Sequence, residues 1–432
     1  MRILFFSHYF SPEVNAPANR THEHCREWVT AGHEVHVITC IPSHPVGSPY
    51  PGFRRSWYRR DTIDGIHVHR VWTYLAANRG IVRRTLNYIS FVPTALFRAL
   101  RLGRFDIAIG TSPQFFCAVA ACLFARARRT PWIFELRDLW PESIAAVGAM
   151  RTSLVLRVVD RLAMRLYRDA AAVVCVTTSF VEMPAGRGIE SRKLHWIPNG
   201  IEPSFWRGTD RRAERASIGV QDDQVLVCYV GTIGMAHGVD TVLEAASRLC
   251  SSAPHVRMLI VGDGAELAHV RDVASRRRIE NVRFTGLVPR SRVPGILTAA
   301  DIALVTLRAA EVFKTVLPSK MFEAMAARTP IVLAVDGEAR HLLARARAGL
   351  AVPPDDASAL ADAIFQLASD AQGRTRMGAA GATFVEREFS RPSWAKRYLE
   401  VLSQLSAGNT KDRVGDLGRQ TMAEEPPLRP LI

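Results

Sequence analysis

The sequence lacks the features that mark secreted or membrane-spanning proteins. Its seven cysteines form no Cys-x-x-Cys pair and mostly lie within apolar runs, so we expect reduced, buried thiols in a cytoplasmic protein. The longest uncharged apolar stretch, residues 115–125, is far shorter than the ~18 residues of a membrane-spanning helix. The short apolar run near the N-terminus has no small-residue cleavage site and is predicted to be a β-strand. We therefore expect a protein that is soluble or lies on a membrane surface.

Acidic residues are too few to balance the basic ones. The chain has 56 lysines and arginines against 41 aspartates and glutamates, a formal net charge of +15. This excess favours anionic partners such as nucleotides, phosphates or an anionic membrane face. None of the recognised nucleic-acid-reading motifs occurs, so no nucleic acid is expected as a partner. The content of 48% hydrophobic residues excludes disorder throughout, and the length of 432 residues favours two domains.

Short strand-like runs alternate with helical patterns almost from end to end. In the first half they include residues 3–6, 35–39, 106–110, 132–136 and 172–176, and in the second half 225–230, 256–261, 282–285, 302–305 and 331–335. This alternation predicts an α/β fold with two doubly wound parallel sheets that meet near residues 201–212. A last helical pattern, 392–405, carries one apolar stripe for docking, and residues 406–432 are predicted to be a disordered tail.

Two glycine-rich loops follow predicted strands of the second half, where open parallel sheets bind ligands. The first loop, YVGTIGMAHG, contains Gly231, Gly234 and Gly238, and the second, VGDG, contains Gly262, Asp263 and Gly264. Glycines let backbone N–H groups approach an anion at a helix N-terminus, so both loops are candidates for a nucleotide pocket. The spacing is not G-x-G-x-x-G, which excludes a dinucleotide fingerprint. The alternative is structural: tight strand-to-helix turns, with Asp263 only capping its helix.

The segment LPSKMFEAMA predicts a helix that starts at Pro318 and Ser319. Lys320 and Glu323 are expected in its first turn, pointing out of the helix N-terminus. A carboxylate there can accept hydrogen bonds from both ribose hydroxyls, and Lys320 can reach a phosphate. Alternatively, Glu323 only interacts favourably with the helix dipole.

The segment FELRDLWPES follows an apolar strand in the first half. Its charged residues Glu135, Arg137, Asp138 and Glu142 are expected to face solvent or a site. Asp138 is the first candidate for orienting or deprotonating reacting groups, and Glu142 is the second. The alternative is a charged loop without a catalytic role.

A basic stretch interleaved with aromatic residues spans 50–105. It includes Arg54, Arg55, Arg59 and Arg60 beside Phe53, Trp57 and Tyr58, followed by an arginine-rich helical pattern. Each basic residue adds about 1 kcal/mol of attraction to an anionic membrane, and aromatic rings lie at the headgroup level. The stretch therefore predicts docking on a membrane, unless it is only a solvated basic face.

In this order and spacing, the motifs resemble the family 4 glycosyltransferases of the GT-B fold. The resemblance is closest to the bacterial branch that transfers amino sugars in O-antigen or capsule assembly, such as the fucosaminyl transferases. It rests on YFSPE, GHEVHVIT, TSPQFF, FELRDLWPES, IPNGIE, YVGTIGMAHG, VGDG, GLVPR and LPSKMFEAMA. It implies two facing Rossmann-like domains, with the acceptor bound by residues 1–203 and the nucleotide sugar by 204–388. A crossover helix, 389–405, returns to the N-terminal domain, and no metal or other cofactor is obligatory.

The resemblance also implies roles for individual residues. The donor set is Gly231, Thr232, Gly234, His237, Gly238, Gly262, Asp263, Gly264, Lys320, Met321 and Glu323. The catalytic set is Asp138, Lys320 and Glu142, and the acceptor and membrane set is Arg54, Arg55, Trp57, Arg59, Arg60 and Arg137. Two residues depart from the family pattern: Thr315 replaces the first glutamate of E-x7-E, and His237 replaces the lysine of the glycine loop.

These observations predict a retaining glycosyltransferase on the inner face of the plasma membrane. It would move an amino or deoxyamino sugar from a UDP-sugar to a polyprenyl-diphosphate-linked acceptor in cell-surface polysaccharide synthesis. Two alternatives stay open: a UDP-sugar 2-epimerase of the same architecture, and a non-catalytic scaffold that binds nucleotide sugars. Thr315 and His237, which lack the expected charges, motivate the scaffold.

Overall fold

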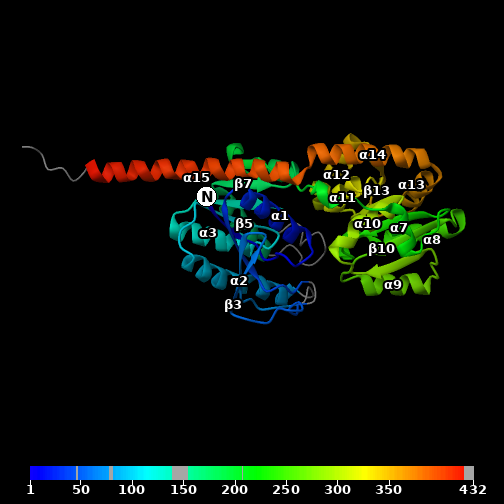
Figure 1. Ribbon diagram of the computed structural model, residues 1–432, viewed down its shortest axis with the longest axis horizontal. Helices are drawn as coiled ribbons and strands as arrows, with labels where there is room; N and C mark the ends of the chain where they lie inside the picture. The colour runs from blue at the N-terminus through cyan, green and yellow to red at the C-terminus, as the bar shows by residue number, and fades with distance from the viewer. Residues whose placement is uncertain (45–46, 77–80, 139–153, 207, 423–432) are drawn as a thin grey trace, which may run out of the picture.

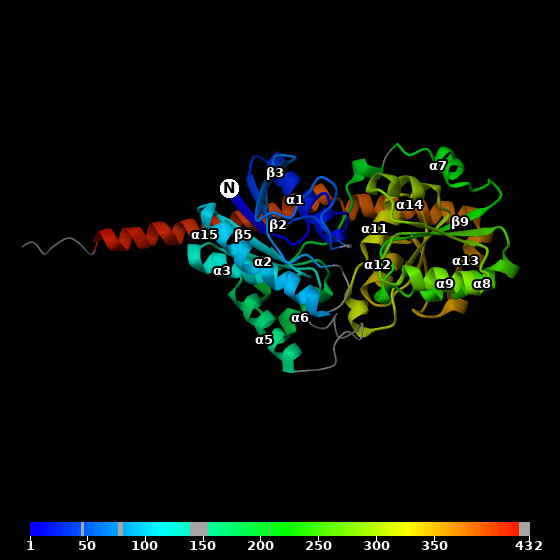
Figure 2. The same ribbon diagram turned by 90° about the horizontal axis from the view of Figure 1, so that it is seen from below.

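The computed structural model describes residues 1–44, 47–76, 81–138, 154–206 and 208–422, which form two α/β domains side by side (Figure 1). Seen from below, the long C-terminal helix passes behind the N-terminal domain and projects beyond it (Figure 2). Each domain has a sheet covered by helices, so the predicted α/β architecture of two doubly wound domains is confirmed. Among the described residues, no helix is long and apolar enough to cross a membrane.

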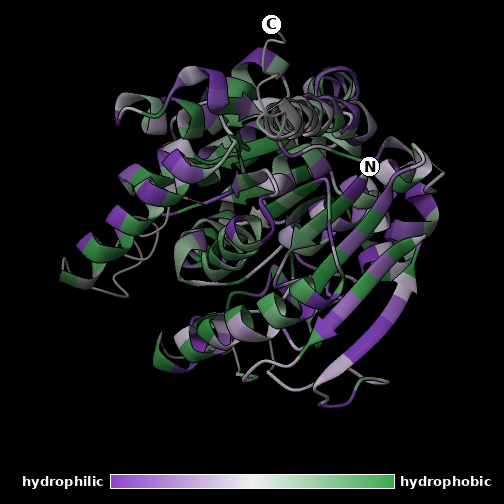
Figure 3. Ribbon diagram, turned by 90° about the vertical axis from the view of Figure 1, so that its left-hand side faces the viewer, coloured by the Kyte–Doolittle hydropathy of each residue, from purple (hydrophilic) through white to green (hydrophobic). Residues whose placement is uncertain are grey.

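The N-terminal domain contains an eight-stranded sheet in the order β3-β4-β2-β1-β5-β6-β7-β8. All neighbours are parallel except β3 and β4. The strands are β1 (Arg2–Phe6), β2 (Glu34–Cys40), β3 (Tyr58–Ile63), β4 (Ile66–Val71), β5 (Ile107–Thr111), β6 (Trp132–Leu136), β7 (Ala172–Cys175) and β8 (Leu194–Trp196). The helices are α1 (Ala16–Thr30), α2 (Ile81–Arg101), α3 (Phe116–Arg128), α5 (Leu154–Asp169), α6 (Ser179–Gly186) and the 3-10 helix η1 (Ser191–Lys193). Polar and apolar residues alternate along the surface helices, whose apolar faces pack on the sheet (Figure 3).

The C-terminal domain contains a six-stranded, fully parallel sheet in the order β11-β10-β9-β12-β13-β14. The strands are β9 (Val225–Val230), β10 (Val256–Val261), β11 (Val282–Gly286), β12 (Ile302–Thr306), β13 (Ile331–Ala334) and β14 (Gly349–Ala351). The α-helices are α7 (Arg211–Ile218), α8 (Val239–Ser252), α9 (Leu267–Arg276), α10 (Val293–Ala299), α11 (Ser319–Ala326), α12 (Glu338–Ala346), α13 (Ala357–Ser369) and α14 (Ala371–Glu388). The 3-10 helices are η2 (Pro203–Trp206), η3 (Met235–His237), η4 (Arg290–Arg292) and η5 (Glu311–Thr315). In both sheets the strand order reverses beside the first strand, where doubly wound folds bind ligands.

Helix α15 (Arg391–Met422) returns from the C-terminal domain to the N-terminal one. The indole of Trp28 in α1 donates to the carbonyl of Ala395 at 3.0 Å, and the Tyr398 ring meets Trp28 edge-on at 5.2 Å. The predicted docking of this helix is therefore confirmed. The helix also extends through residues 406–422, where the sequence predicted a disordered tail. This segment contains no proline, so every residue can continue the backbone hydrogen bonding of the helix.

Two chain segments connect the domains and lie against each other. The backbone of Ile201 donates to Phe389 at 2.9 Å and accepts from Arg391 at 2.8 Å. A Cβ at Gly200 would lie 2.3 Å from the Phe389 carbonyl oxygen, so this close approach requires glycine.

Candidate functional site

The two glycine loops lie together at the carboxyl ends of β9 and β10. The Ile233 amide donates to the Asp263 carbonyl at 2.9 Å. A Cβ at Gly262 would lie 1.9 Å from the Gly231 carbonyl oxygen, and one at Gly264 would lie 2.2 Å from that of Ile233. Glycine is therefore required where the loops touch, which supports the structural explanation for Gly262 and Gly264.

Asp263 does not cap helix α9. The residue before the helix is Glu266, and the exposed Asp263 carboxylate accepts from the Gly264 amide at 2.7 Å. The capping alternative is therefore wrong, and the exposed carboxylate remains at the mouth of the glycine loops, beside the exposed Thr232.

The loop after β9 forms η3 and then enters α8 through Gly238, whose φ of 60° favours glycine. The hydroxyl of Thr306, at the end of β12, donates to the His237 carbonyl at 2.6 Å and holds this loop. Burial and the nearby charge of Lys320 lower the pKa of His237 to about 3. The histidine is therefore neutral, and its Nδ1 makes no hydrogen bond to a described residue. A ligand can therefore form a hydrogen bond with His237 at the position where the family pattern has a charged lysine.

Lys320 reaches from the start of α11 into the first glycine loop. Its Nζ donates to the Tyr229 hydroxyl at 2.9 Å and lies 4.0 Å from the centre of that ring. A Cβ added at Gly231 would lie 3.3 Å from the same Nζ. Burial lowers the pKa of Lys320 to about 7, although the charge of Glu323 opposes this shift. An arriving diphosphate would restore the charge of the amine.

The sequence predicted Glu323 in the first turn of its helix. Glu323 is the fifth residue of α11 and therefore lies just beyond that turn. Burial raises its pKa, whereas the charges of Arg290 and Lys320 lower it. Arg290 belongs to η4 and forms an ion pair with Glu23 of the N-terminal domain. Glu323 therefore lies near the boundary between the domains. Met321 is fully buried in the core, so only its backbone can contribute to a donor site.

The segment with the missing family glutamate forms η5. The Thr315 hydroxyl donates to the Val312 carbonyl at 2.7 Å, and the exposed Glu311 pairs with Lys314 at 2.6 Å. Val312 and Val316 pack against the N-terminal core. The η5 segment therefore packs against the N-terminal domain at the domain boundary. Its Glu311 is paired with Lys314 on the surface.

In the N-terminal domain, Glu135 does not face solvent or a site as the sequence predicted. It belongs to β6, is fully buried, and pairs with the buried Arg20 at 3.0 Å. It also accepts from the Thr111 hydroxyl at 2.7 Å. The expectation that Glu135 faces solvent or a site is wrong, because the charge is neutralised inside the domain.

Arg137 and Asp138 follow β6 at its carboxyl end. Arg137 donates to the Pro17 carbonyl at 3.3 Å, at the start of α1, so it does not join the basic stretch with which it was grouped. Burial lowers its pKa to about 10, and the charges of Glu135 and Asp138 oppose the shift. Asp138 is partly exposed. Glu142 lies outside the described residues.

The basic aromatic stretch includes the outer hairpin formed by β3 and β4. Arg54, Arg55 and Arg60 are exposed, whereas Arg59 pairs with Asp61 at 2.8 Å and stacks on Phe53. Trp57 is 76% exposed. Further exposed apolar side chains lie on α2 and α5, two helices that both pack on α3. They are Val82, Leu86, Ile89, Phe97, Leu154, Val158 and Leu162. Sequence reasoning missed α5, although its apolar spacing with interleaved arginines was a usable signal.

A second missed group follows β1 and β2 at their carboxyl ends. The Glu13 carboxylate accepts from the amides of Ser43 and His44, each at 2.9 Å. Burial raises its pKa to about 7 against these hydrogen bonds. The His8 ring meets Tyr9 and Tyr88 edge-on at 5.3 and 5.1 Å. Glu13 stands in YFSPE, a motif to which the sequence assigned no chemistry.

Two family models match this chain and together span most of it. "Glycosyl transferase 4-like domain" matches residues 15–200, and "Glycosyl transferases group 1" matches residues 210–384. The colanic acid biosynthesis glycosyl transferase WcaI of Escherichia coli is 27% identical over 338 residues, 76% of this chain and 81% of the relative. The glycosyltransferase WbjE of Pseudomonas aeruginosa is 25% identical over 272 residues, 62% of this chain and 67% of the relative.

Solved structures with the same fold cover nearly the whole chain. Sucrose-phosphate synthase from Thermosynechococcus elongatus superposes with a TM-score of 0.75 at 18% identity, over 94% of this chain and 99% of the other. HepE of Anabaena, in complex with UDP-glucose, gives 0.70 at 18% identity, over 94% and 100%. WaaG, involved in lipopolysaccharide biosynthesis, gives 0.68 at 16% identity, over 93% and 99%.

Proposed function

Because the chain belongs to the group 1 glycosyltransferases with the GT-B fold, which use a nucleotide sugar without an obligatory cofactor, we propose that it transfers an amino or deoxyamino sugar from a UDP-sugar. The acceptor in this proposal is a polyprenyl-diphosphate-linked glycan of cell-surface polysaccharide synthesis. Its relatives support the proposal: WcaI is named for colanic acid biosynthesis, and a 26% identical relative from Streptomyces kanamyceticus is a kanosaminyltransferase. The epimerase and scaffold alternatives have no such support.

The observation that carries the proposal is Lys320 beside the glycine loop. When the sugar leaves, negative charge develops on the diphosphate. Lys320 Nζ, the backbone around Gly231 and the N-terminal end of α8 lie together to meet that charge. With a pKa of about 7, the amine is only partly charged beforehand, so its interaction with the ligand strengthens as the diphosphate becomes more negative.

The acceptor hydroxyl attacks the sugar carbon from the face that the diphosphate leaves. In a retaining transferase, the departing phosphate can take the hydroxyl proton. No covalent intermediate on a carboxylate is then needed, unlike in the retaining glycosidases. Asp138 orients the acceptor or the sugar from the end of β6. The partly exposed rings of Tyr9 and Tyr88, which lie against the buried His8, offer faces and edges on which an acceptor sugar can pack.

The membrane part of the proposal rests on the exposed surface of the N-terminal domain. The arginines of the β3–β4 hairpin supply attraction that salt screens, and the apolar residues of α2 and α5 supply insertion that salt does not weaken. Together they would hold the protein on the inner face of the plasma membrane, where a lipid-linked acceptor is presented.

The transfer test uses three variants with a panel of UDP-sugars. Lys320→Ala is expected to lower turnover roughly 100-fold and donor affinity much less, because its interaction is strongest in the transition state. Asp138→Asn keeps the shape of the side chain and is expected to lower transfer with UDP affinity unchanged. Glu311→Gln, on the surface of η5, is the control. Wild-type turnover in Lys320→Ala would contradict the donor assignment.

The membrane test compares two sets of four arginine-to-glutamine changes. Changing Arg54, Arg55, Arg59 and Arg60 should reduce co-sedimentation with anionic vesicles and activity on a long-chain acceptor. Activity on a short soluble acceptor should persist. The control set, with equal charge removed, is the exposed Arg276, Arg277, Arg278 and Arg376 of the C-terminal domain. Equal effects of the two sets would contradict membrane docking through the hairpin.

A further inference from the structure

A cluster of potential metal ligands lies at the start of β2 and β4, at the opposite end of the N-terminal sheet from the transfer site. His36 and His67 are paired across these parallel strands. Glu34 precedes His36 by two residues on the same strand, so all three side chains lie on one face of the sheet. The strand register itself therefore brings them together.

The three side chains are close enough to share one ion. One ligand atom from each lies within 4.8 Å of the others, and Glu34 Oε1 lies 2.8 Å from His36 Nε2. Ligand bonds of about 2.0–2.2 Å in a tetrahedral zinc site place ligand atoms roughly 3.3 Å apart. Glu34 is exposed and His67 partly exposed, so both can rotate toward the buried His36.

Hydrogen bonds behind His36 prepare it for such a role. Its Nδ1 lies 3.0 Å from His69 Nε2, and His69 Nδ1 lies 2.9 Å from the Tyr58 hydroxyl. When an ion takes Nε2 of His36, Nδ1 must carry the proton and donate to His69. His69 then donates to Tyr58, whose hydroxyl can accept as well as donate. The chain can thus reverse without leaving a buried nitrogen unpaired, as the supporting hydrogen bonds of metal-binding histidines require.

The charges around the cluster permit binding. Arg2 occupies Glu34 Oε2 at 2.9 Å and leaves Oε1 available. Arg60, 3.4 Å from His67 Nδ1, is exposed and long enough to withdraw. Imidazole nitrogens and a carboxylate oxygen are common ligands of divalent transition metals.

We propose that Glu34, His36 and His67 bind a zinc ion, or a similar divalent transition metal, that clamps β2 to β4 away from the transfer site. Two imidazoles and one carboxylate suit zinc and leave its fourth position to water. The site lies away from the donor loops, and only its neighbour Arg60 belongs to the surface proposed for the membrane. It therefore stands or falls independently of the proposed sugar transfer.

The test titrates zinc chloride into the full-length, untagged, chelator-treated protein by calorimetry, with cobalt chloride as a spectroscopic probe. We expect one zinc per chain, a rise in Tm on adding zinc, and a cobalt absorption band. His67→Ala and Glu34→Gln should weaken zinc binding at least about tenfold. The control His269→Ala removes an exposed histidine of α9 and should bind like the wild type.

Circular dichroism and UDP affinity, measured on the same samples, show whether each variant is folded. His67→Gln, which keeps much of the side-chain volume, replaces His67→Ala if the latter does not fold. Absence of zinc binding in the wild type, or equal zinc binding in folded wild-type and His67 variants, would overturn the site. If the wild-type protein did not bind UDP, that result would count against the transfer proposal alone.

Discussion

At the scale of single residues, the proposed contact of Lys320 with the diphosphate would link the protonation of the protein to binding of the donor. Its pKa is about 7 in the free protein, and an anionic diphosphate must raise it. At pH 8 the amine is mostly neutral, while the terminal phosphate of UDP, with a pKa near 6, is already ionised. Binding of UDP should therefore take up a proton, and UDP affinity should fall as pH rises above 7.

Calorimetry in buffers of different ionisation enthalpy measures this uptake directly. Lys320→Met, which keeps the length of the side chain but cannot titrate, should abolish most of the uptake. Identical binding enthalpies across buffers for the wild type at pH 8 would show that Lys320 does not recharge.

Glu323 provides a second residue-scale prediction, for recognition of the ribose. Glu323→Gln should weaken UDP binding roughly tenfold, because hydrogen bonds to a charged acceptor contribute about 1.5–3 kcal/mol. The Tm should change little, since the side chain is partly exposed. The matched probe is 2′-deoxy-UDP: the substitution should cost less affinity for this ligand than for UDP. Equal losses for both nucleotides would rule out contact with the 2′-hydroxyl.

The sequence predicts which residues meet at the proposed donor site better than it predicts their environments. Lys320 and the glycine loops were identified from motif and position, and the structure places them in contact. The burial of Glu135 was not foreseen, because its partner Arg20 lies 115 positions away in the chain. A pKa depends on such distant neighbours, so the lowered pKa values of Lys320 and His237 had no local signal either.

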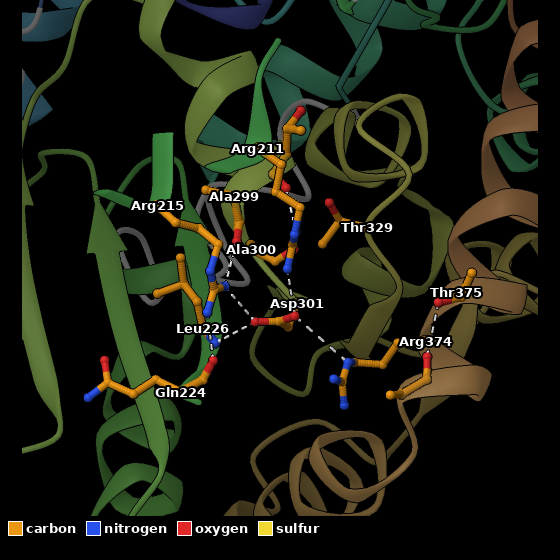
Figure 4. A network of polar contacts seen from close by, with 12 residues as sticks. Arg211, Arg215, Gln224, Leu226, Ala299, Ala300, Asp301, Thr329, Arg374 and Thr375 are labelled. Atoms are coloured by element: carbon orange, nitrogen blue, oxygen red, sulfur yellow. Dashed lines mark hydrogen bonds and ion pairs between the residues drawn. The ribbon is translucent and has the colours of Figure 1, made fainter. Parts of the chain in front are cut away.

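At the scale of elements, Asp301 ties together the amino-terminal ends of β9 and β12 (Figure 4). Its carboxylate accepts from Arg211 at 2.6 Å, from the buried Arg215 at 2.9 Å and from the Leu226 amide at 2.8 Å. Asp301→Ala should lower the free energy of unfolding by about 3 kcal/mol, since it leaves Arg215 charged and unpaired. Urea unfolding measures this loss. Asp362→Ala, at an exposed site on α13, is the control and should change stability little.

Elements differ in how well the sequence predicts them. The strands at 225–230 and 256–261 were predicted at their observed bounds, because apolar runs, broken in the second strand only by the exposed Arg257, mark buried strands. The hairpin of β3 and β4 was not predicted. Its outer strand, β3, alternates between exposed and partly buried residues. The arginines of this strand were interpreted as part of a membrane-binding surface. The Asp64–Gly65 turn, with φ of 49° and 77°, was the hairpin signal in the sequence.

At the scale of the whole molecule, Glu338 joins the two domains. Its carboxylate accepts from the amides and hydroxyls of Thr178 and Ser179, at 2.8–3.1 Å, at the start of α6. Glu338→Ala should let the domains separate, which small-angle scattering would detect as a larger radius of gyration. Transfer should fall while UDP affinity persists, because the proposed donor residues lie in one domain. A radius and turnover equal to those of the wild type would show that this contact is dispensable.

The side-by-side passage of the chain at Ile201 and Phe389 has a consequence for its modular organisation. Topologically, the C-terminal domain is an insertion, because the N-terminal domain is completed only when α15 packs on Trp28. Both ends of the insert emerge at one point, so we expect residues 204–388 to be excisable as a module that still binds UDP. A truncation at residue 203 would instead leave the host domain unfinished, with the surface around Trp28 bare. A stand-alone host domain would need α15 spliced back onto the end of β8.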